Sequence, residues 1–380
     1  MGSRGVDGSS GARESVRVDE LERGYLMAVA GALVWSPRAL RQWLDTFGSA
    51  RAVRDAACSE PTAPLDVEPL TTAAVERLRA VDDAAARRAN DDLARSGARL
   101  VTDADEAYPR GLRDLRDAPP VLYVRGDLGV LGERAVAIVG SRAATSYGRH
   151  VAATLAAELG GMGACIVSGL ARGIDAAAHK AALGASAPTV AVVGSGLCAL
   201  YPTYHSLLAD DIVAAGGAVM SEFPPLTAPR SFQFPMRDRI VAALATATIV
   251  VEASVRSGAL ITARLADDLS RHVFAIPGDV GRPTSEGTNG LIKDGVPLVT
   301  SALDAALMMG WTLGVGSASD RHGESQQDDP LLALVPRAGI DADALAALTN
   351  IDVGTLLARL TMLEIRGLVE RLPGGSFARR

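Results

Sequence analysis

The sequence has few aromatic residues, few cysteines and no long apolar run. Aromatic residues make up 4% of its 380 residues, which suits tight packing of helices on a sheet and leaves little for stacking on nucleobases. The three cysteines, Cys58, Cys165 and Cys198, show no CxxC or other metal-ligand spacing, and the five histidines do not cluster. No metal site is therefore predicted, and Cys165 and Cys198, which lie in or beside apolar runs, are expected to be core thiols.

The chain also lacks a signal peptide, a membrane-spanning run and an excess of basic residues. We therefore expect a cytoplasmic protein that does not bind membranes. The formal net charge is −6, so any binding of nucleic acid must depend on a local basic patch rather than on general attraction. A length of 380 residues allows two or three domains, one of them with a large core.

The stretch from residue 136 to residue 175 predicts the start of a doubly wound α/β sheet. Two apolar strands, Val136–Val139 and Ala164–Val167, are each followed by a short loop and a helix. Both loops leave the carboxyl ends of their strands, where such sheets bind ligands. Small residues in the loops let the backbone approach a phosphate, and an arginine in each adds a fork of donors. The residues of this predicted phosphate site are Gly140, Ser141, Arg142, Ser168, Gly169 and Arg172.

Later strand ends add candidates to the same site. The turn at Gly194 begins a G-x-G-x-x-A pattern that matches a dinucleotide fingerprint. However, Tyr201-Pro202 interrupts the following helix and no acidic residue stands at the expected spacing, so a glycine turn lining the same crevice is the better interpretation. A helix expected from about Pro235 carries two arginines in its first turn, where they oppose the helix dipole and are best explained by a bound anion. The added candidates are Gly194, Arg237, Arg239, Arg256, Ser257 and Asn289.

The glycine-rich loop after the strand His272–Ile276 allows two interpretations. Its segment Gly287-Thr288-Asn289 can offer backbone amides to a phosphate. Alternatively, it is a surface loop in which Asn289 caps a short helix. The residues alone do not decide between them.

Composition and periodicity divide the chain into five segments. The helical segment contains an FGSARAV turn similar to a helix-hairpin-helix, a contact for DNA backbones elsewhere, although packing or protein contact is the preferred role. The last segment has the helix-turn-helix and hairpin pattern of a winged helix, and its mixed charges favour protein contact over DNA binding. The predicted segments are a disordered start (1–19), a small helical domain (20–98), an extended Rossmann-like domain with a mostly parallel sheet (99–311), a linker (312–328) and a winged helix (329–380).

An ordered series of motifs runs from residue 100 to residue 311. The series comprises YPRGLRDLRDAPPVLYVRG, VAIVGSRAATSYGR, IVSGLARGIDAAAH, VAVVGSGL before Tyr-Pro, SEFPP, FPMRDRIVAAL, VVEASVRSGALITA and FAIPGDVGRPTSEGTNGLIKDGVPLVT. Each motif alone is weakly specific, but in this order they resemble the DNA-processing protein A family (DprA, also called Smf) of bacterial transformation. The helical start and the winged block also match variable additions of that family.

The resemblance implies a protein that binds single-stranded DNA in a basic pocket, protects incoming DNA and loads the RecA recombinase onto it. It implies a homodimer without catalytic residues or cofactors. The family's pocket arginines fall on Arg142, Arg237 and Arg239. Two departures lower the positive potential: Asp238 replaces a usual asparagine, and Thr203 replaces a basic residue of many members. We therefore expect weaker or more salt-sensitive DNA binding than is usual for the family.

For a single-strand binder, contacts to phosphate are expected to dominate, and sequence preference should be slight. Three of the few aromatic residues, Tyr201, Phe232 and Phe234, lie in loops from which they can stack on bases.

The alternative is a Rossmann-like hydrolase of nucleotides or nucleoside monophosphates. Glu222 and Glu252 end strands and can be read as general bases, and Asp175 and His179 lie one helical turn apart, as an acid–base pair would. The Pro277–Gly281 loop, however, lacks the Pro-Gly-Gly-x-Gly-Thr pattern of those enzymes. Structural roles are therefore the favoured interpretation of these side chains.

Overall fold

A computed structural model of the chain describes residues 10–59, 67–311, 330–336, 339–349, 351, 353–365, 368–372 and 376–379. The chain forms two compact units, Met1–Trp311 and Thr312–Arg380. The whole of the predicted linker (312–328) lies outside the described residues, as do residues 1–9 of the predicted disordered start. Among the described helices, none combines the length and hydropathy that crossing a bilayer requires.

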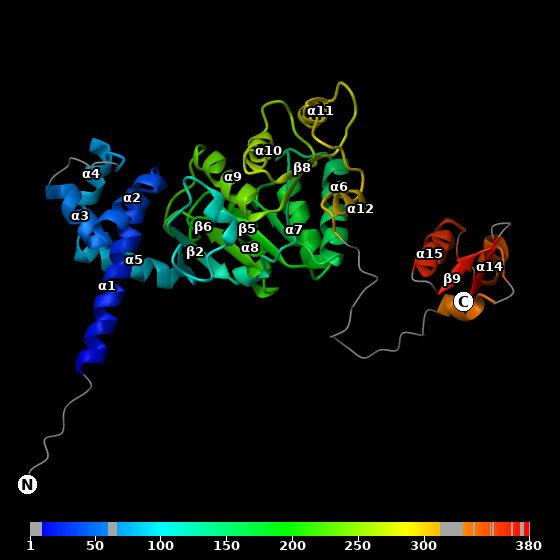
Figure 1. Cartoon of the computed structure of the whole chain (residues 1–380), viewed down its shortest axis with the longest axis horizontal. Coiled ribbons are helices and arrows are strands. Elements are labelled where there is room, and N and C mark those ends of the chain that lie inside the picture. The colour runs from blue at the N-terminus through cyan, green and yellow to red at the C-terminus, as the bar shows by residue number, and fades with distance from the viewer. Residues whose placement is uncertain are drawn as a thin grey trace, which may run out of the picture. The chain divides into compact units, whose positions relative to one another are not determined.

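The first unit begins with a group of helices (Figure 1). Its first helix starts at Ser10, so the prediction of a disordered start is wrong for residues 10–19. The segment ARESVRVDELER has little apolar content but is rich in arginine and glutamate, which favour helices. The helices are α1 (Ser10–Ala32), α2 (Pro37–Phe47), α3 (Ala50–Ser59), α4 (Thr72–Arg79) and α5 (Asp83–Ser96).

The turn between α2 and α3 is not open to a DNA phosphate. Gly48 ends α2 in the left-handed region at φ 76°, where glycine carries no steric cost. The amino end of α3 then receives the carboxylate of Glu22, whose Oε1 accepts a hydrogen bond from the backbone N–H of Ala50 at 2.6 Å. Because this acid from α1 occupies the free N–H groups that a helix-hairpin-helix offers to DNA, the packing interpretation of FGSARAV is the one that fits.

A sheet of eight strands forms the centre of the unit, in the order β1-β2-β6-β5-β4-β3-β7-β8. The strands from β6 to β8 in this order are parallel, whereas β1 and β2 are added antiparallel at one edge, next to β6. This arrangement confirms the predicted mostly parallel, doubly wound sheet. The strands are β1 (Arg99–Thr102), β2 (Val121–Gly126), β3 (Ala135–Val139), β4 (Cys165–Ser168), β5 (Thr189–Val192), β6 (Ala218–Ser221), β7 (Ala247–Val250) and β8 (His272–Ala275).

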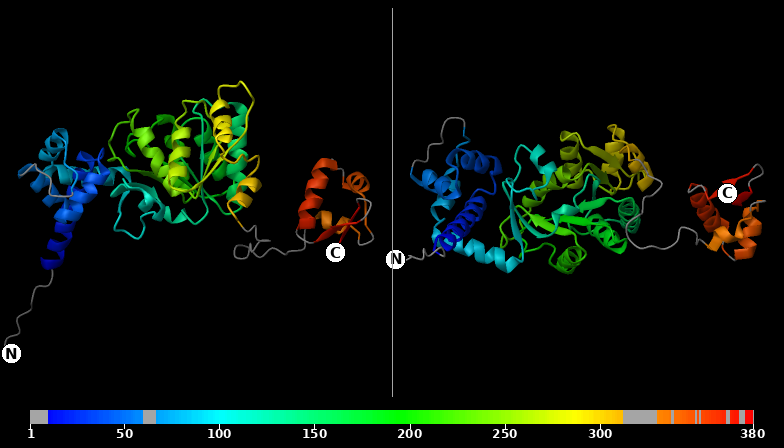
Figure 2. Two further views of the ribbon diagram at one scale, coloured as in Figure 1. Left: turned by 45° about the horizontal axis from the view of Figure 1, so that its top comes forward. Right: turned by 60° about the horizontal axis from the view of Figure 1, so that its bottom comes forward.

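Helices cover both faces of the sheet, as the two views of Figure 2 show. Small alanine side chains dominate both interfaces, which lets the helices pack closely. One face is covered by α6 (Ser146–Gly161), α7 (Ile174–Gly184), α8 (Ser206–Ala214) and α12 (Ala302–Met308). The other face is covered by α9 (Gln233–Leu244), α10 (Ala259–Asp268) and α11 (Glu286–Lys293). Short 3-10 turns lie at Arg110–Asp114, Leu128–Val130 and Thr203–His205.

The N-terminal helices share a core with the sheet. One buried cluster joins Trp43 and Leu40 of α2 to Tyr123 of β2. In addition, the ring of Trp35 packs on Phe223 and Phe232, with centroid distances of 5.8 and 4.8 Å. The helical segment therefore supports the loop that follows β6.

The second unit has the helices and hairpin of a winged helix, as predicted. Its core joins Leu345, Leu356 and Leu360 to Phe377. The hairpin pattern predicts a turn at Gly374-Gly375, and both glycines lie outside the described residues. The elements are α13 (Pro330–Leu334), α14 (Ala342–Thr349), α15 (Val353–Ile365) and the antiparallel strands β9 (Val369–Arg371) and β10 (Phe377–Arg379).

Candidate nucleic-acid interface

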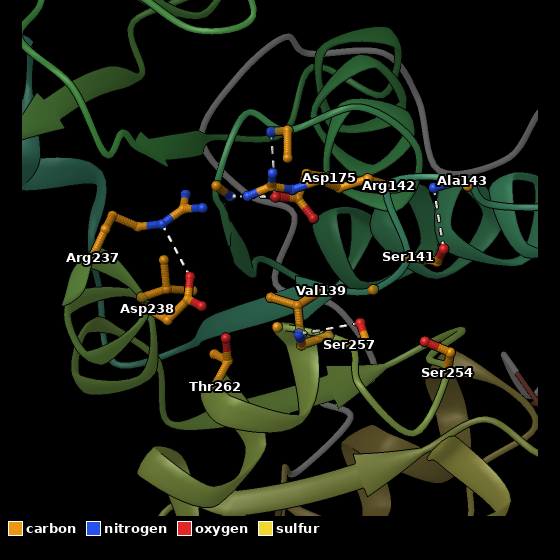
Figure 3. A pocket seen from close by; sticks show the side chains of 16 residues that line it. Val139, Ser141, Arg142, Ala143, Asp175, Arg237, Asp238, Ser254, Ser257 and Thr262 are labelled. Carbon is orange, nitrogen blue, oxygen red and sulfur yellow. Dashed lines mark hydrogen bonds and ion pairs between the residues drawn. The ribbon is translucent and has the colours of Figure 1, made fainter. Parts of the chain in front are cut away.

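The candidate site lies where the direction of winding changes in the sheet. From β3 the chain winds one way through β4, β5 and β6, and then returns to place β7 on the other side of β3. The loops after β3 and β7 therefore diverge to opposite faces and leave a crevice between them, the place where open α/β sheets bind ligands. Figure 3 shows the side chains that line this crevice.

Close backbone packing holds the loop after β3. The N–H of Ser141 donates to the carbonyl of Glu252 at 2.7 Å, and the N–H of Ile174 donates to the carbonyl of Ser141 at 3.3 Å. Gly173 has φ 81°, and a Cβ there would stand 2.2 Å from the oxygen of Ser141. Gly173, which precedes α7, is thus required for the contact between the loops after β3 and β4.

A cavity of about 400 Å³ lies at the crevice, a size at which proteins commonly hold small ligands. Its walls come from the loops after β3, β4 and β7 and from the facing sides of α9 and α10. The polar and charged lining residues are Ser141, Arg142, Asp175, Arg237, Asp238, Ser254, Ser257 and Thr262.

Arg237 is a buried cation of the cavity wall, with only 4% of its surface exposed. Its Nη1 donates to the carbonyl of Val192 at 2.5 Å, and its Nε lies 3.1 Å from Oδ1 of Asp238. The guanidinium lies against Gly169, where a Cβ would come within 1.9 Å of Nη1. Gly169 therefore serves the site by leaving room for Arg237.

The position of Arg237 in its helix differs from the prediction. Because α9 begins at Gln233, two residues before Pro235, Arg237 and Arg239 lie beyond the first turn. The argument from the helix dipole therefore does not apply to them, since that effect falls off within one turn.

Two buried carboxyl groups share the cavity with the arginines. Burial raises the pKa of Asp175, while the charge of Arg237 lowers it. The Oδ2 of Asp175 accepts hydrogen bonds from the N–H groups of Gly169 at 3.1 Å and Ala171 at 3.3 Å. Burial also raises the pKa of Asp238 to about 6, again opposed by Arg237 and increased by Asp175. The interior of the cavity is thus of mixed charge.

The rim of the cavity is more basic than its interior. Arg142 is exposed, and its guanidinium lies over the ring of Phe234, with Cζ 4.6 Å from the centroid. A second groove adjoins the cavity through Arg142, Asp238 and Gly258. Its further lining residues are Tyr201, Pro229, Arg230, Ser231, Phe234, Pro235, Arg256 and Ile261.

The structure brings together about half of the predicted site. Gly140, Ser141, Arg142, Gly169, Arg237 and Ser257 line the cavity. Arg256 lines the adjoining groove and is exposed there.

Three predicted residues lie near the lining residues but do not themselves line the cavity: Ser168, Arg172 and Gly194. The buried hydroxyl of Ser168 donates to the carbonyl of Ile138 at 2.6 Å, a contact within the sheet. Gly194 packs beneath Phe234, where a Cβ would stand 3.0 Å from the ring. Arg172 is exposed on the loop before α7.

Arg239 is a structural arginine rather than a lining residue of the cavity. It forms a bidentate ion pair with Glu222, in which Nη1 and Nη2 donate to the two carboxylate oxygens at 2.7 Å each. Its Nε donates to Asp117 at 2.8 Å, and Nη1 also donates to the carbonyl of Met236. With these donors already engaged, Arg239 joins α9 to the loop before β2 and to the end of β6.

Asn289 is likewise structural, and neither interpretation of its segment fits. It lies inside α11, so it is not a cap. Its side-chain amide accepts from the N–H of Gly278 at 3.1 Å and donates to the carbonyl of Gly278 at 2.9 Å. The N–H of Gly287 already donates to the carbonyl of Ala253, so this amide is not available to a phosphate.

Three lining residues were not predicted from the sequence: Ser254 and Thr262 of the cavity and Arg230 of the groove. Thr262 lies four residues after Gly258 on α10, so the helical period could have placed it on the same side as the loop. Nothing local marks Arg230, which reaches the groove through the fold of a proline-rich loop. The cysteine prediction is confirmed for Cys165, where burial raises the thiol pKa to about 12, and is wrong for Cys198, which is exposed.

Known proteins match the chain over both units. The family model for DNA recombination-mediator protein A matches residues 99–309, and the model for the DprA winged helix domain matches residues 317–375. Protein Smf of Escherichia coli is 39% identical over 285 residues, which cover 73% of this chain and 76% of the relative. A DNA processing protein DprA of Mycobacterium tuberculosis is 38% identical over 305 residues, covering 74% of this chain and 78% of the relative.

Solved structures give the same answer for the fold. The structure of DprA from Streptococcus pneumoniae has a TM-score of 0.61 and 32% identity, over 77% of this chain and 96% of the other. The structure of DprA from Helicobacter pylori, described by its single-stranded DNA binding mode, has a TM-score of 0.51 and 31% identity, over 57% of this chain and 99% of the other. The present chain belongs to the DNA recombination-mediator protein A family, the family of the DprA and Smf proteins.

Proposed function

We propose that this protein binds single-stranded DNA at the cavity between the loops after β3 and β7, as part of DNA processing in transformation. The observation that carries the proposal is a cavity whose rim is cationic and whose interior is not. Three exposed arginines form no salt bridge with the described residues: Arg142, which lines both the cavity and the adjoining groove, and Arg230 and Arg256, which line the groove. Their charges are thus available to phosphate groups.

The interior of the cavity suits a base better than a phosphate. Asp175 and Asp238 are both buried there, and a phosphate placed against the carboxylate of Asp238, which is ionised at neutral pH, would be repelled. A neutral base instead finds hydrogen-bonding groups and small residues. The strand is therefore expected to place one base in the cavity and its phosphates against Arg142 and the neighbouring rim arginines.

Exposed aromatic rings next to the cavity favour a single strand over a duplex. Tyr201 lines the groove that adjoins the cavity and is 48% exposed, and its ring lies 5.7 Å from that of Phe234, which lines the same groove. Phe232 is 47% exposed, but it packs on Trp35 and lines neither the cavity nor the groove. Unpaired bases can stack on such rings, whereas the bases of a duplex are already stacked on one another.

The finer parts of the function rest on the family resemblance. Protection of the incoming strand, loading of RecA and formation of a homodimer are proposed on that ground. For the winged helix we keep protein contact as the proposed role.

A hydrolase is the second candidate, and the contacts of the possible catalytic groups speak against it. Glu222 is paired with Arg239, and Glu252 accepts hydrogen bonds from the backbone and hydroxyl of Thr145. Nδ1 of His179 is engaged with the hydroxyl of Thr189 at 2.7 Å, and burial lowers the pKa of His179 to about 3, so it stays neutral. Each of these three groups has a structural partner. Asp175, which lines the cavity, accepts hydrogen bonds from the backbone N–H groups of Gly169 and Ala171.

The test is to measure binding of fluorescent oligo-dT and turnover of nucleoside monophosphates by the same preparation. The proposal expects saturable binding that Arg142→Ala weakens, without release of free base. Arg99→Ala is the matched control, because Arg99 is an exposed arginine on the edge strand β1. Release of base or phosphate by the wild type, with no binding of oligo-dT, would reverse the choice between the two candidates.

A further inference from the structure

Asp238 presents an unpaired carboxylate oxygen to the cavity. Its side chain comes from α9, and Oδ1 is held by the Nε of Arg237 at 3.1 Å (Figure 3). Among the described residues, none donates a hydrogen bond to Oδ2. This oxygen faces Gly258, where an added Cβ would stand 3.8 Å away, and Gly258 has no side chain to cover it. Both the cavity and the groove reach this point.

The charges around Asp238 come from several elements. Arg237 is its neighbour on α9, Asp175 faces it from α7, and Arg142 faces it from the loop after β3. Arg256 lines the groove that adjoins the cavity. With a pKa of about 6, the carboxyl group is ionised at neutral pH and then only accepts hydrogen bonds.

We propose that Asp238 makes the cavity prefer guanine over the other bases of a bound strand. This inference rests on the proposed function, and it departs from the slight sequence preference that the residues alone led us to expect. Guanine presents two neighbouring donors, N1–H and the 2-amino group, which together match a carboxylate. Adenine and cytosine present one amino group beside an acceptor nitrogen, and thymine presents one N–H between two carbonyl oxygens. Because an ionised carboxylate only accepts hydrogen bonds, it repels these acceptor atoms.

The hydroxyl of Thr262 strengthens the match. Thr262 is 2% exposed and lines the cavity from α10, on the same side as the Asp238 carboxylate (Figure 3). A hydroxyl can donate to O6 of the guanine whose N–H groups bind the carboxylate. An asparagine at position 238 would lose the preference, because its amide presents one donor and one acceptor and can pair with any of the bases.

Acid conditions should reduce the preference. Below the pKa of Asp238, the protonated carboxyl group has one donor and one acceptor, as an asparagine does. Discrimination between guanine and thymine should therefore decline as the pH falls through about 6. The charges that surround the group stay in place, apart from Asp175, whose pKa is also raised.

The experiment compares short thymine oligonucleotides that carry one central guanine, hypoxanthine or thymine, by fluorescence anisotropy with the wild-type chain. Hypoxanthine keeps N1–H and O6 but lacks the 2-amino group. At neutral pH we expect guanine to bind about fivefold or more tightly than thymine, the discrimination that a bidentate contact provides, with hypoxanthine between them. The guanine advantage should shrink in acid and in Asp238→Asn.

Equal binding of the guanine and thymine oligonucleotides at neutral pH would overturn the inference and leave the proposed function intact. A guanine preference that persists undiminished in Asp238→Asn would also overturn it. If no oligonucleotide binds to the wild type, the proposed function fails and the inference fails with it. Comparing hypoxanthine with guanine needs no variant, so the result does not depend on how well the substituted protein folds.

Discussion

The guanidinium of Arg142 lies over the ring of Phe234, with its Cζ 4.6 Å from the ring centroid. The contact joins the loop after β3 to the start of α9, and both residues line the groove that adjoins the cavity. An exposed arginine placed on an aromatic ring is held in position while its N–H groups stay accessible. Arg142 is thus held ready for a phosphate or a base, which leads to the first prediction.

Arg142→Ala should weaken oligo-dT binding without unfolding the protein. Loss of one phosphate contact should reduce the slope of log K against log salt by about 0.7. Because the side chain is exposed, its removal should change the free energy of unfolding by no more than about 1 kcal/mol. Titrations at several salt concentrations measure the slope, and an unchanged slope would show that Arg142 does not contact the strand. Arg142→Lys, which keeps the charge, should retain most of the slope.

Asp238 should make the protein less stable as the pH rises. The folded pKa of about 6 exceeds the ordinary value of 3.8, so the folded protein holds more protons than the unfolded chain between these values. The free energy of unfolding therefore falls as the pH rises from about 4 to about 6, by up to about 3 kcal/mol from this group. Asp238→Asn should match the wild type in acid and be more stable by about 1–3 kcal/mol near neutral pH. Urea unfolding at both pH values tests this, and a difference that does not vary with pH would contradict it.

Arg239→Ala should destabilise the fold strongly. Its removal leaves the buried carboxylate of Glu222 without its bidentate partner, a loss that typically costs about 3–5 kcal/mol. Arg172→Ala is the comparison, because Arg172 is exposed and should cost less than about 0.5 kcal/mol. Equal unfolding midpoints for the two variants in urea would refute the structural role of Arg239.

Asn289→Ala should affect stability and leave DNA binding unchanged. The side chain makes two hydrogen bonds to the backbone of Gly278, and their loss should cost about 1–3 kcal/mol. The residue does not line the cavity, so the affinity for oligo-dT should remain that of the wild type wherever the variant is folded. A loss of affinity in the fully folded variant would place Asn289 at the interface after all.

Local patterns account for what could be predicted. Apolar runs followed by glycine marked the parallel strands and their loops, because such strands are buried on both faces and their loops meet at one edge. Gly140, Ser141, Arg142 and Gly169 were found by this rule. So was the two-sided arrangement of the sheet, because strands and helices alternate along the chain.

Partners distant in sequence account for what could not be predicted. Arg239 pairs with Glu222 and Asp117, which lie 17 and 122 residues away in the sequence. No local pattern shows that its guanidinium is already paired with these acids. Asn289 meets Gly278 through the fold of a loop. Its two predicted roles were a helix cap and an anion contact, and neither of these is the hydrogen bonding to Gly278 that it has. The fold decides which arginine is available and which is already neutralised.

The contact of Trp35 with Phe223 and Phe232 also sets where the protein can be divided for experiments. A shortened version that begins at residue 99 would expose Phe223, which is fully buried in the intact chain, and would release Phe232 from its support. An exposed apolar patch of this kind promotes self-association. Such a fragment is therefore a poor substitute for the intact chain when affinities are measured.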